Sequence, residues 1–188
     1  MCPGNYSDTN KFKQDAEREG ITFIILDSHE EIAQNLFATG TVLRTDEYYN
    51  GPKGLLVRDS KTNNLVEDII VDDQSAGMLT ASGWIMMSGC GHSGIINTAK
   101  KLQSIKNIPI YGAIGGFHLF QASDELIDKT AMWLKNAGMT KFMGGHCTGI
   151  YAAERVADKI GITRNNLSHT ALGSILTKDL SLIRSSVE

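Results

Sequence analysis

The chain has 188 residues, of which 41% are hydrophobic and 21% charged, which is enough apolar material for the core of one globular domain. Its formal net charge of -3 gives no electrostatic reason to expect nucleic acid as a partner. No apolar run approaches the roughly 18–20 residues that a membrane span needs. Three cysteines without a framework spacing, and a start unlike a signal peptide, predict a cytoplasmic protein with free thiols.

The first part of the chain is predicted to contain a surface helix, several strands and a hairpin. Polar residues 7–19 indicate the helix, with Ser7 as a candidate N-cap and Gly20 just past its end. His29 follows in an acidic loop and is expected to be a solvated surface residue. Segments rich in β-branched residues predict strands at 21–26, 40–44, 55–58, 65–71 and 76–80. The third and fourth of these are expected to pair as an antiparallel hairpin.

A sequence motif that occurs three times dominates the rest of the chain. An apolar run ends in glycine, a histidine follows, and a segment of helical periodicity comes next. The apolar runs, expected to be strands, are residues 84–88, 108–114 and 141–143. The histidines are His92, His118 and His146, and the candidate caps of the three helices that follow are Ser93, Ser123 and Thr148. Because open α/β sheets bind ligands at the carboxyl ends of their strands, the three histidines are expected to form a site. A last edge strand is expected within 167–176.

Two interpretations of these histidines compete. Neutral imidazole is a common ligand of zinc and related ions, and the flanking glycines allow the backbone to approach a bound ion closely. Alternatively, each histidine caps a strand end through hydrogen bonds. The occurrence of three histidines at equivalent positions favours the metal interpretation. Asp72 and Asp73 precede the first copy of the motif. Either they form a solvated turn, or Asp73 faces the histidines and belongs to the same site.

A cysteine nucleophile is the third alternative. Cys90 lies two residues before His92, and Cys147 follows His146, where a helix N-terminus would lower a thiol pKa. The side chains of sequence neighbours at a strand end point apart, however, so each thiol would need a histidine from another copy of the motif. Buried free cysteine is also common and usually inert. This mechanism predicts inactivation by thiol alkylation and indifference to chelators.

Four segments of the chain together resemble one branch of a known family. They are DDQ at 72–74, SGCGHSGI at 88–95, IGGFHL at 114–119 and HCTG at 146–149. In this order and spacing they resemble the dihydropterin ribofuranosylaminobenzene phosphate synthase-like branch of the metallo-β-lactamase superfamily. The resemblance implies an α/β fold, an αββα sandwich, with one or two divalent ions, expected to be zinc. It also implies that His92 and His146 are metal ligands, and that His118 and Asp73 are further site residues on the catalytic or substrate side.

The chain departs from that family in one respect. The superfamily's main metal motif, His-x-His-x-Asp-His, does not occur in it. We therefore expect residues 1–188 to form a single incomplete domain, the second half of the fold, whose exposed inner sheet face pairs in a homo-oligomer or with a complementing N-terminal half. The expected function is hydrolysis of an ester or phosphoester bond of a small molecule, with a phosphorylated or pterin-related compound as the candidate substrate. The alternative is a non-catalytic binding or assembly subunit.

Overall fold

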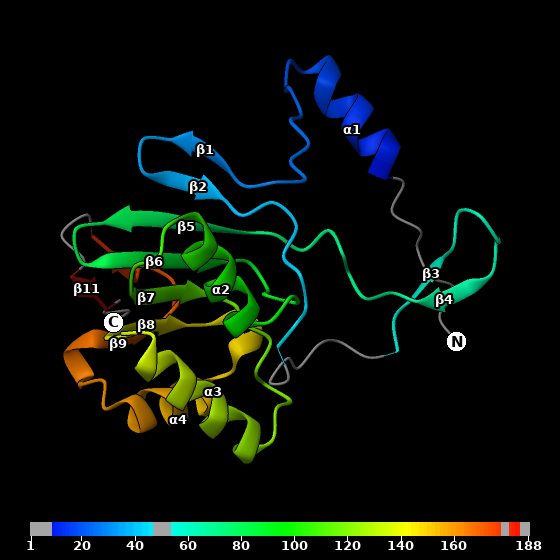
Figure 1. Ribbon diagram of the computed structural model, residues 1–188. Helices are drawn as coiled ribbons and strands as arrows, with labels where there is room; N and C mark the ends of the chain where they lie inside the picture. The colour runs from blue at the N-terminus through cyan, green and yellow to red at the C-terminus, as the bar shows by residue number, and fades with distance from the viewer. Residues whose placement is uncertain (1–8, 47–53, 178–180, 185–188) are drawn as a thin grey trace.

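The computed structural model describes residues 9–46, 54–177 and 181–184. Figure 1 shows a central sheet with helices against it, and two small elements, α1 and the β3–β4 hairpin, that extend away from it. The elements are α1 (Thr9–Arg18), β1 (Glu30–Ala33), β2 (Leu36–Ala38), β3 (Leu56–Arg58), β4 (Leu65–Glu67), β5 (Ser75–Thr80), β6 (Gly83–Ser88), α2 (Ile95–Ile105), β7 (Ile110–Gly115), α3 (Asp124–Asn136), β8 (Lys141–Gly144), η1 (His146–Thr148), α4 (Ile150–Ile160), η2 (Arg164–Asn166), β9 (Leu167–His169), β10 (Ile175–Leu176) and β11 (Leu182–Ile183).

Seven strands form one mixed sheet in the order β1-β2-β5-β6-β7-β8-β9. The first three pairings are antiparallel, as in the hairpin of β5 and β6, and β6 to β9 are parallel. Parallel neighbours need a crossover connection, and α2, α3 and α4 provide one between each successive pair of strands. The carboxyl ends of β6, β7 and β8 therefore lie side by side at one edge of the sheet.

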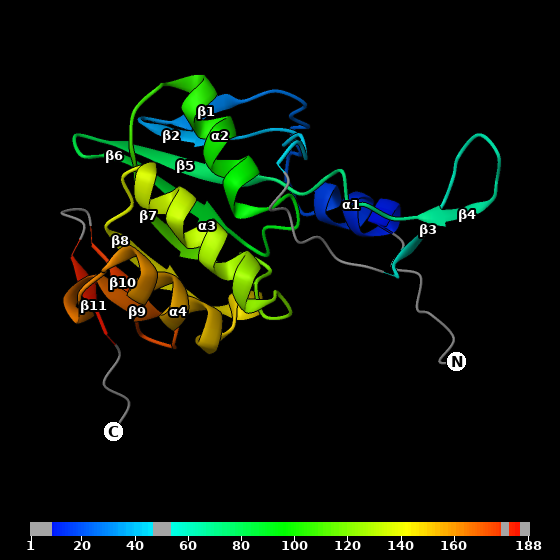
Figure 2. The same cartoon turned by 60° about the horizontal axis from the view of Figure 1, so that its bottom comes forward.

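The three crossover helices cover one face of this sheet (Figure 2). Trp84 and Met86 of β6 are fully buried beneath them, together with Leu102 of α2, Leu134 of α3 and Val156 of α4. The indole Nε1 of Trp84 donates to the carbonyl of Lys106 at 2.9 Å, so the largest core side chain keeps its polar atom satisfied. This core holds the crossover helices, and with them the loops at their N-termini, in fixed positions.

Side chains that alternate with these point to the opposite face. There Ala76, Met87 and Ile114, with Ala38, line a shallow apolar depression. Within the described residues, the seven-stranded sheet thus carries one layer of crossover helices, and β3–β4 and β10–β11 form two separate two-stranded sheets. The predicted α/β class is confirmed, and the described layers correspond to one sheet-and-helix half of the expected αββα sandwich.

Several N-terminal predictions were wrong. Residues 21–26 form no strand, and Ile24 and Ile25 are 75% and 81% exposed. Residues 40–44 also form no strand. The edge of the sheet is made instead by β1 and β2, which turn at Asn35, a residue with φ 62°. β-propensity identified apolar segments correctly but could not say which would find a hydrogen-bonding partner.

The remaining predicted elements agree with the structure, except that the strand expected over 65–71 extends only over β4. The hairpin of β3 and β4 is confirmed, and so are the helix α1 and the three crossover helices. Ser123 caps α3 by accepting the Leu126 backbone N–H, and Gly161 ends α4 in a left-handed conformation. The last edge strand is confirmed only over β9. The candidate cap Ser7 lies outside the described residues.

Candidate metal centre

The loops that follow β6, β7 and β8 bring five side chains with potential metal-donor atoms to the carboxyl edge of the sheet. Cys90 and His92 come from the first loop, His118 from the second, and His146 and Cys147 from the third. Their donor atoms form two overlapping groups, and within each group all donor atoms lie within 4.8 Å of one another. The predicted convergence of the three copies of the motif at one edge of the sheet is therefore confirmed.

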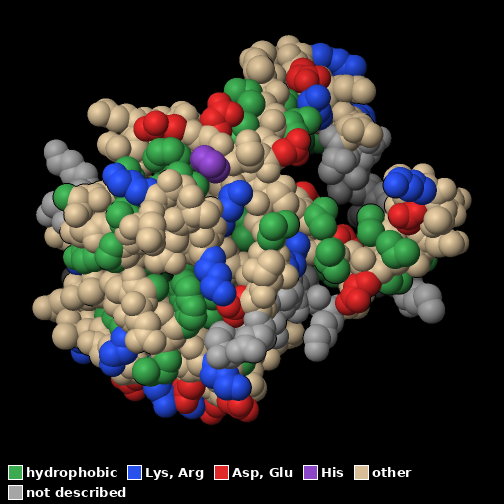
Figure 3. All heavy atoms as spheres, in the orientation of Figure 1, with side chains coloured by type: hydrophobic (Ala, Val, Ile, Leu, Met, Phe, Trp, Pro, Cys, Tyr) green, Lys and Arg blue, Asp and Glu red, His purple; other side chains and the backbone are tan. Residues whose placement is uncertain are grey.

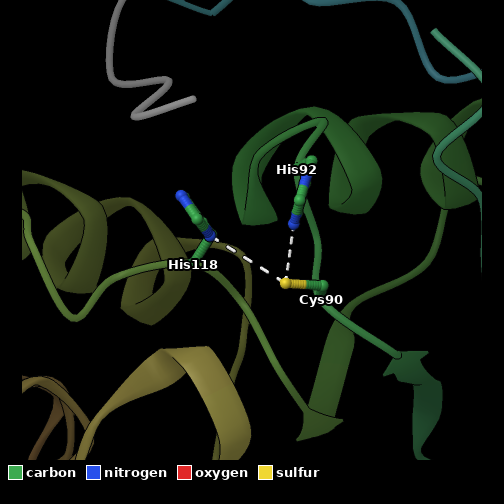
Figure 4. A group of neighbouring side chains, drawn as sticks. All are labelled: Cys90, His92 and His118. Atoms are coloured by element: carbon green, nitrogen blue, oxygen red, sulfur yellow. Dashed lines mark hydrogen bonds between the residues drawn. The ribbon is translucent and has the colours of Figure 1, made fainter. Parts of the chain in front are cut away.

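The sulfur of Cys90 lies at the centre of this arrangement. His92 Nε2 is 2.7 Å from it and His118 Nδ1 is 3.9 Å away, so two imidazoles point at one thiol from different loops (Figure 4). The Cys147 sulfur is 3.0 Å from the Cys90 sulfur. The expectation that Cys90 and His92 point apart was wrong, because Gly91, with φ 64°, reverses the chain between them.

The approach of the three loops depends on positions where a side chain would not fit. A Cβ on Gly115, whose φ is +119°, would lie 1.9 Å from the carbonyl oxygen of Ser88, in the neighbouring strand. A Cβ on Gly116 would meet the backbone of the first loop at 2.4 Å and the Cys147 sulfur at 3.1 Å. The recurring glycines are therefore required for the strand ends to approach one another this closely.

Two of the site histidines have unusual backbone conformations. His118 and His146 have φ values of 48° and 50°, in the left-handed region that disfavours residues with a Cβ. Such a conformation costs roughly 1–3 kcal/mol and persists only where the surrounding structure enforces it. Here it turns each imidazole toward the loop cluster immediately after its strand ends.

Two hydroxyl groups join the loops and do not cap helices, which corrects the prediction for Ser93 and Thr148. The N-cap residues of α2 and α4 are Gly94 and Gly149, neither with a side-chain hydrogen bond. Thr148 Oγ1 is fully buried, accepts the Phe117 backbone N–H at 3.0 Å and donates to the carbonyl of Gly115 at 3.1 Å. It thus ties the third loop to the second.

Asp73 is attached to the first loop. Its Oδ2 accepts the backbone N–H of Ser93 at 2.9 Å, and the Ser93 hydroxyl donates to its carbonyl at 3.4 Å. Its charge adds, after burial and Cys147, to the raised pKa of Cys90, and it opposes the lowering of the His118 pKa that burial and His92 cause. Asp73 is not a member of either donor group among the described residues.

The electrostatics of the cluster favour the neutral forms of Cys90 and His118. Burial, followed by the hydrogen bond and charge of Cys147, raises the pKa of Cys90 to about 12. Burial, followed by the charge of His92, lowers the pKa of His118 below its ordinary 6.5, against the opposing effect of Asp73. At neutral pH Cys90 is then a thiol and His118 a neutral imidazole, which is the form that binds metal.

The donor set fits a soft or borderline divalent ion. Thiolate and imidazole are the ligands that zinc prefers. The Nδ1 atom of His92 is buried without a hydrogen-bond partner in the described structure, so this ring has unused binding capacity. Two donors on one tetrahedral zinc stand roughly 3.5–3.8 Å apart. The Cys90–His92 and Cys90–Cys147 spacings are shorter, so the Cys90 sulfur would need to shift by less than about 1 Å.

The structure does not group the predicted ligands as expected. His92 falls in one donor group with Cys90 and His118, and the exposed His146 falls in the other with Cys90 and Cys147. His92 and His146, paired in the prediction, are linked only through Cys90. Cys90 and Cys147 were predicted to be inert thiols or nucleophiles, and not metal donors. The position of each cysteine inside a copy of the recurring motif was the signal that it could also be a metal donor.

No protein-family model matches the chain. Among curated proteins it is 34% identical over 155 residues to the 7,8-dihydropterin-6-methyl-4-(beta-D-ribofuranosyl)-aminobenzene-5'-phosphate synthase of Methanocaldococcus jannaschii. The matched region covers 81% of this chain and 52% of that protein. This chain is 32% identical over 155 residues to the uncharacterized protein MJ0448 of the same organism, covering 81% and 53%. The chain thus spans about half the length of these relatives. Among solved structures it is similar to Tm1679, a metal-dependent hydrolase of the β-lactamase superfamily, with a TM-score of 0.65, 26% identity and coverage of 79% and 55%.

Proposed function

Because this chain belongs to the metallo-β-lactamase superfamily, in its dihydropterin ribofuranosylaminobenzene phosphate synthase-like branch, we propose that it binds a divalent ion at the carboxyl edge of its sheet and acts in metal-dependent hydrolysis. The observation that carries this proposal is the convergence of three imidazoles and two thiols from three separate loops. The proposed ion is zinc, on the chemistry of these donors. The scissile bond is an ester or phosphoester.

The side chains have distinct proposed roles. His92 and His118 hold the ion together with Cys90, and the exposed His146 holds it from the third loop or contacts the substrate at the rim. Asp73 positions the first loop through the Ser93 N–H and contributes negative charge that favours a cation. The chemistry that a divalent ion supplies in such a site is a lowered water pKa and a polarised electrophile.

A small phosphorylated or pterin-related molecule is the proposed substrate. Its first support is the name of the curated relative, a synthase of a pterin-containing phosphate. The second is local: α2 and α4 both begin at this edge with glycine N-caps that form no side-chain hydrogen bond. Their N-terminal N–H groups and helix dipoles favour an anionic group.

A second candidate function is that of a binding or assembly subunit without catalysis. Two observations favour it: the sequence lacks the His-x-His-x-Asp-His motif, and the helix-free sheet face carries an apolar depression. In this alternative the chain uses that face to join a partner. Both candidates are compatible with the fold, and they differ in whether the chain retains metal.

Metal content separates the two candidates. The purified chain, His92→Ala, His146→Ala and the control His29→Ala are loaded with zinc, dialysed and measured by elemental analysis. We expect stoichiometric metal in the parent and in His29→Ala, whose imidazole is exposed and outside the cluster, and a loss of at least about tenfold in affinity in the two site variants. Hydrolysis of p-nitrophenyl acetate and bis(p-nitrophenyl) phosphate is measured on the same samples.

The result that contradicts the hydrolase is equally definite. If the parent chain retains no metal, and neither site variant changes that, the chain by itself is not a metal-dependent hydrolase. Metal retention without turnover of either ester would support the binding subunit. Turnover that survives chelators and is abolished by thiol alkylation would support a cysteine nucleophile.

A further inference from the structure

Cys90 and Cys147 occupy a position that metal binding alone does not explain. Their sulfurs are 3.0 Å apart, and each comes from a different loop, 57 residues apart in the chain. Both are free thiols. A disulfide bond is about 2.0 Å long, and two thiolates on one tetrahedral zinc stand roughly 3.8 Å apart. The observed spacing lies between these values, so either arrangement needs the sulfurs to move by about 1 Å or less.

Hydrogen bonds hold the two thiols against each other. The Cys147 thiol donates to the carbonyl of Cys90 at 3.0 Å and accepts the backbone N–H of His118 at 3.1 Å. The second of these contacts fixes the Cys147 sulfur against the second loop. Cys90 lies between Gly89, whose Cβ position is open space, and Gly91, which packs against the second loop and so keeps the two thiols close.

We propose that Cys90 and Cys147 form a redox-modification site, at which a peroxide converts the two thiols into a reversible disulfide. The Cys147 sulfur attacks one oxygen of hydrogen peroxide and gives up its proton, and the departing hydroxide takes up that proton to form water. The resulting sulfenic acid is attacked by the Cys90 sulfur, which forms the S–S bond. The second water leaves with the sulfenic oxygen and the Cys90 proton. Two thiols are oxidised by two electrons, and one peroxide is reduced to two waters.

This modification has a consequence for the metal site, and that consequence rests on the proposed function. Cys90 Sγ is the atom shared by both donor groups. A sulfur engaged in a disulfide is no longer a thiolate and cannot be a strong metal ligand. The disulfide and a Cys90-bound ion therefore exclude each other, and oxidation releases the ion while a bound ion protects the thiols.

Thiol counting and peptide mapping test the disulfide. The metal-free chain is treated with hydrogen peroxide, and we expect its three titratable thiols to fall to one, with a mass loss of two hydrogens and recovery of all thiols by dithiothreitol. Non-reducing peptide mapping should give a cross-linked pair containing Cys90 and Cys147. Cys2→Ser should retain this cross-link, whereas Cys90→Ser and Cys147→Ser should lose it.

The parent chain alone decides the question, even if a variant fails to fold. Retention of all thiols in peroxide, or oxidation to sulfinic acid without a cross-linked peptide, would overturn the proposal. A cross-link between different chains, seen as a dimer on a non-reducing gel, would overturn it as well.

Zinc titration of the reduced and oxidised chain tests the consequence for the metal. We expect the oxidised chain to bind zinc at least about tenfold more weakly, and the zinc-loaded chain to lose its thiols more slowly in peroxide. Equal zinc affinity in both redox states would overturn the exclusion between metal and disulfide. If neither state binds zinc, the proposed function fails, while the peptide map still decides whether the disulfide forms.

Discussion

At the scale of single residues, the site depends on positions that allow three loops to approach one another. Gly115 is the clearest of these, since both its φ of +119° and the 1.9 Å approach to the Ser88 carbonyl exclude a side chain. Gly161 makes a useful comparison. It also has a positive φ, +86°, but its Cβ position is open space.

We predict that Gly115→Ala lowers the free energy of unfolding by at least about 3 kcal/mol, because it adds a clash to the backbone strain. Gly161→Ala should cost only about 1–2 kcal/mol, the strain of a left-handed alanine. Urea unfolding followed by circular dichroism measures both. Equal costs for the two substitutions would show that the close contact at Gly115 is not a constraint on the fold.

Thr148 offers a second prediction at this scale. Thr148→Val keeps the shape of the side chain but leaves the Phe117 N–H without its acceptor, in a fully buried position. We expect a cost of about 1–3 kcal/mol in unfolding free energy and weaker zinc binding, because the second and third loops are no longer tied. Thr148→Ser, which keeps the hydroxyl, is the control and should lose less of both. Zinc affinity equal to the parent in Thr148→Val would argue against this tie.

At the scale of elements, an ion-pair network joins α3 to α4. Arg155 donates to Asp128 through Nε at 2.7 Å, Lys159 pairs with the same carboxylate at 2.7 Å, and Arg155 Nη1 also pairs with Asp124 at 3.1 Å. The hydrogen bonds from Arg155 and then Lys159 lower the pKa of Asp128 below 3.8. This carboxylate therefore stabilises the fold above its unfolded-state pKa, and the contribution is lost as pH falls through the lowered value.

We predict that Asp128→Asn lowers the melting temperature at pH 7 and reduces its decline below about pH 4. Glu125→Gln is the matched control on the same helix. Glu125 is 77% exposed and pairs only with Lys129 among the described ion pairs, so its loss should change the melting temperature less. Melting curves between acidic and neutral pH would contradict the prediction if both variants behaved alike.

At the scale of the whole molecule, the two faces of the seven-stranded sheet differ. One face of the sheet is covered by three crossover helices, and the other carries the apolar depression around Ala76, Met87 and Ile114. On the face shown in Figure 3, acidic and basic side chains of the described residues are interspersed, with no broad basic patch. No helix in the described ranges is long and apolar enough to cross a membrane.

We predict that the isolated chain self-associates through the helix-free face of the sheet, because an apolar surface of this kind ordinarily finds a partner. Met87→Glu, in the depression, should shift the chain toward monomer in size-exclusion chromatography. Met132→Glu, on the exposed side of α3, makes the same chemical change on the opposite layer and should not. A compact monomer of the parent chain would refute the prediction outright.

The sequence by itself determined the part of the fold in which each element is defined by local periodicity. The recurring strand–glycine–histidine motif predicted the three crossover helices. It also predicted that His92, His118 and His146 lie together at the carboxyl edge of β6 to β8. Parallel strands joined by crossover helices place like ends together, so a local pattern was enough to predict a shared location.

Only the tertiary structure decided which groups contact each other. Residues 21–26 have strand propensity but no pairing partner, so β1 and β2 make the edge instead. Ser93 and Thr148 are capping residue types, yet their hydroxyls bond to backbone groups of other segments. Cys90 and Cys147 meet at 3.0 Å because glycines let two loops approach within contact distance. Contacts between segments far apart in the chain depend on how strand ends align, which no local pattern encodes.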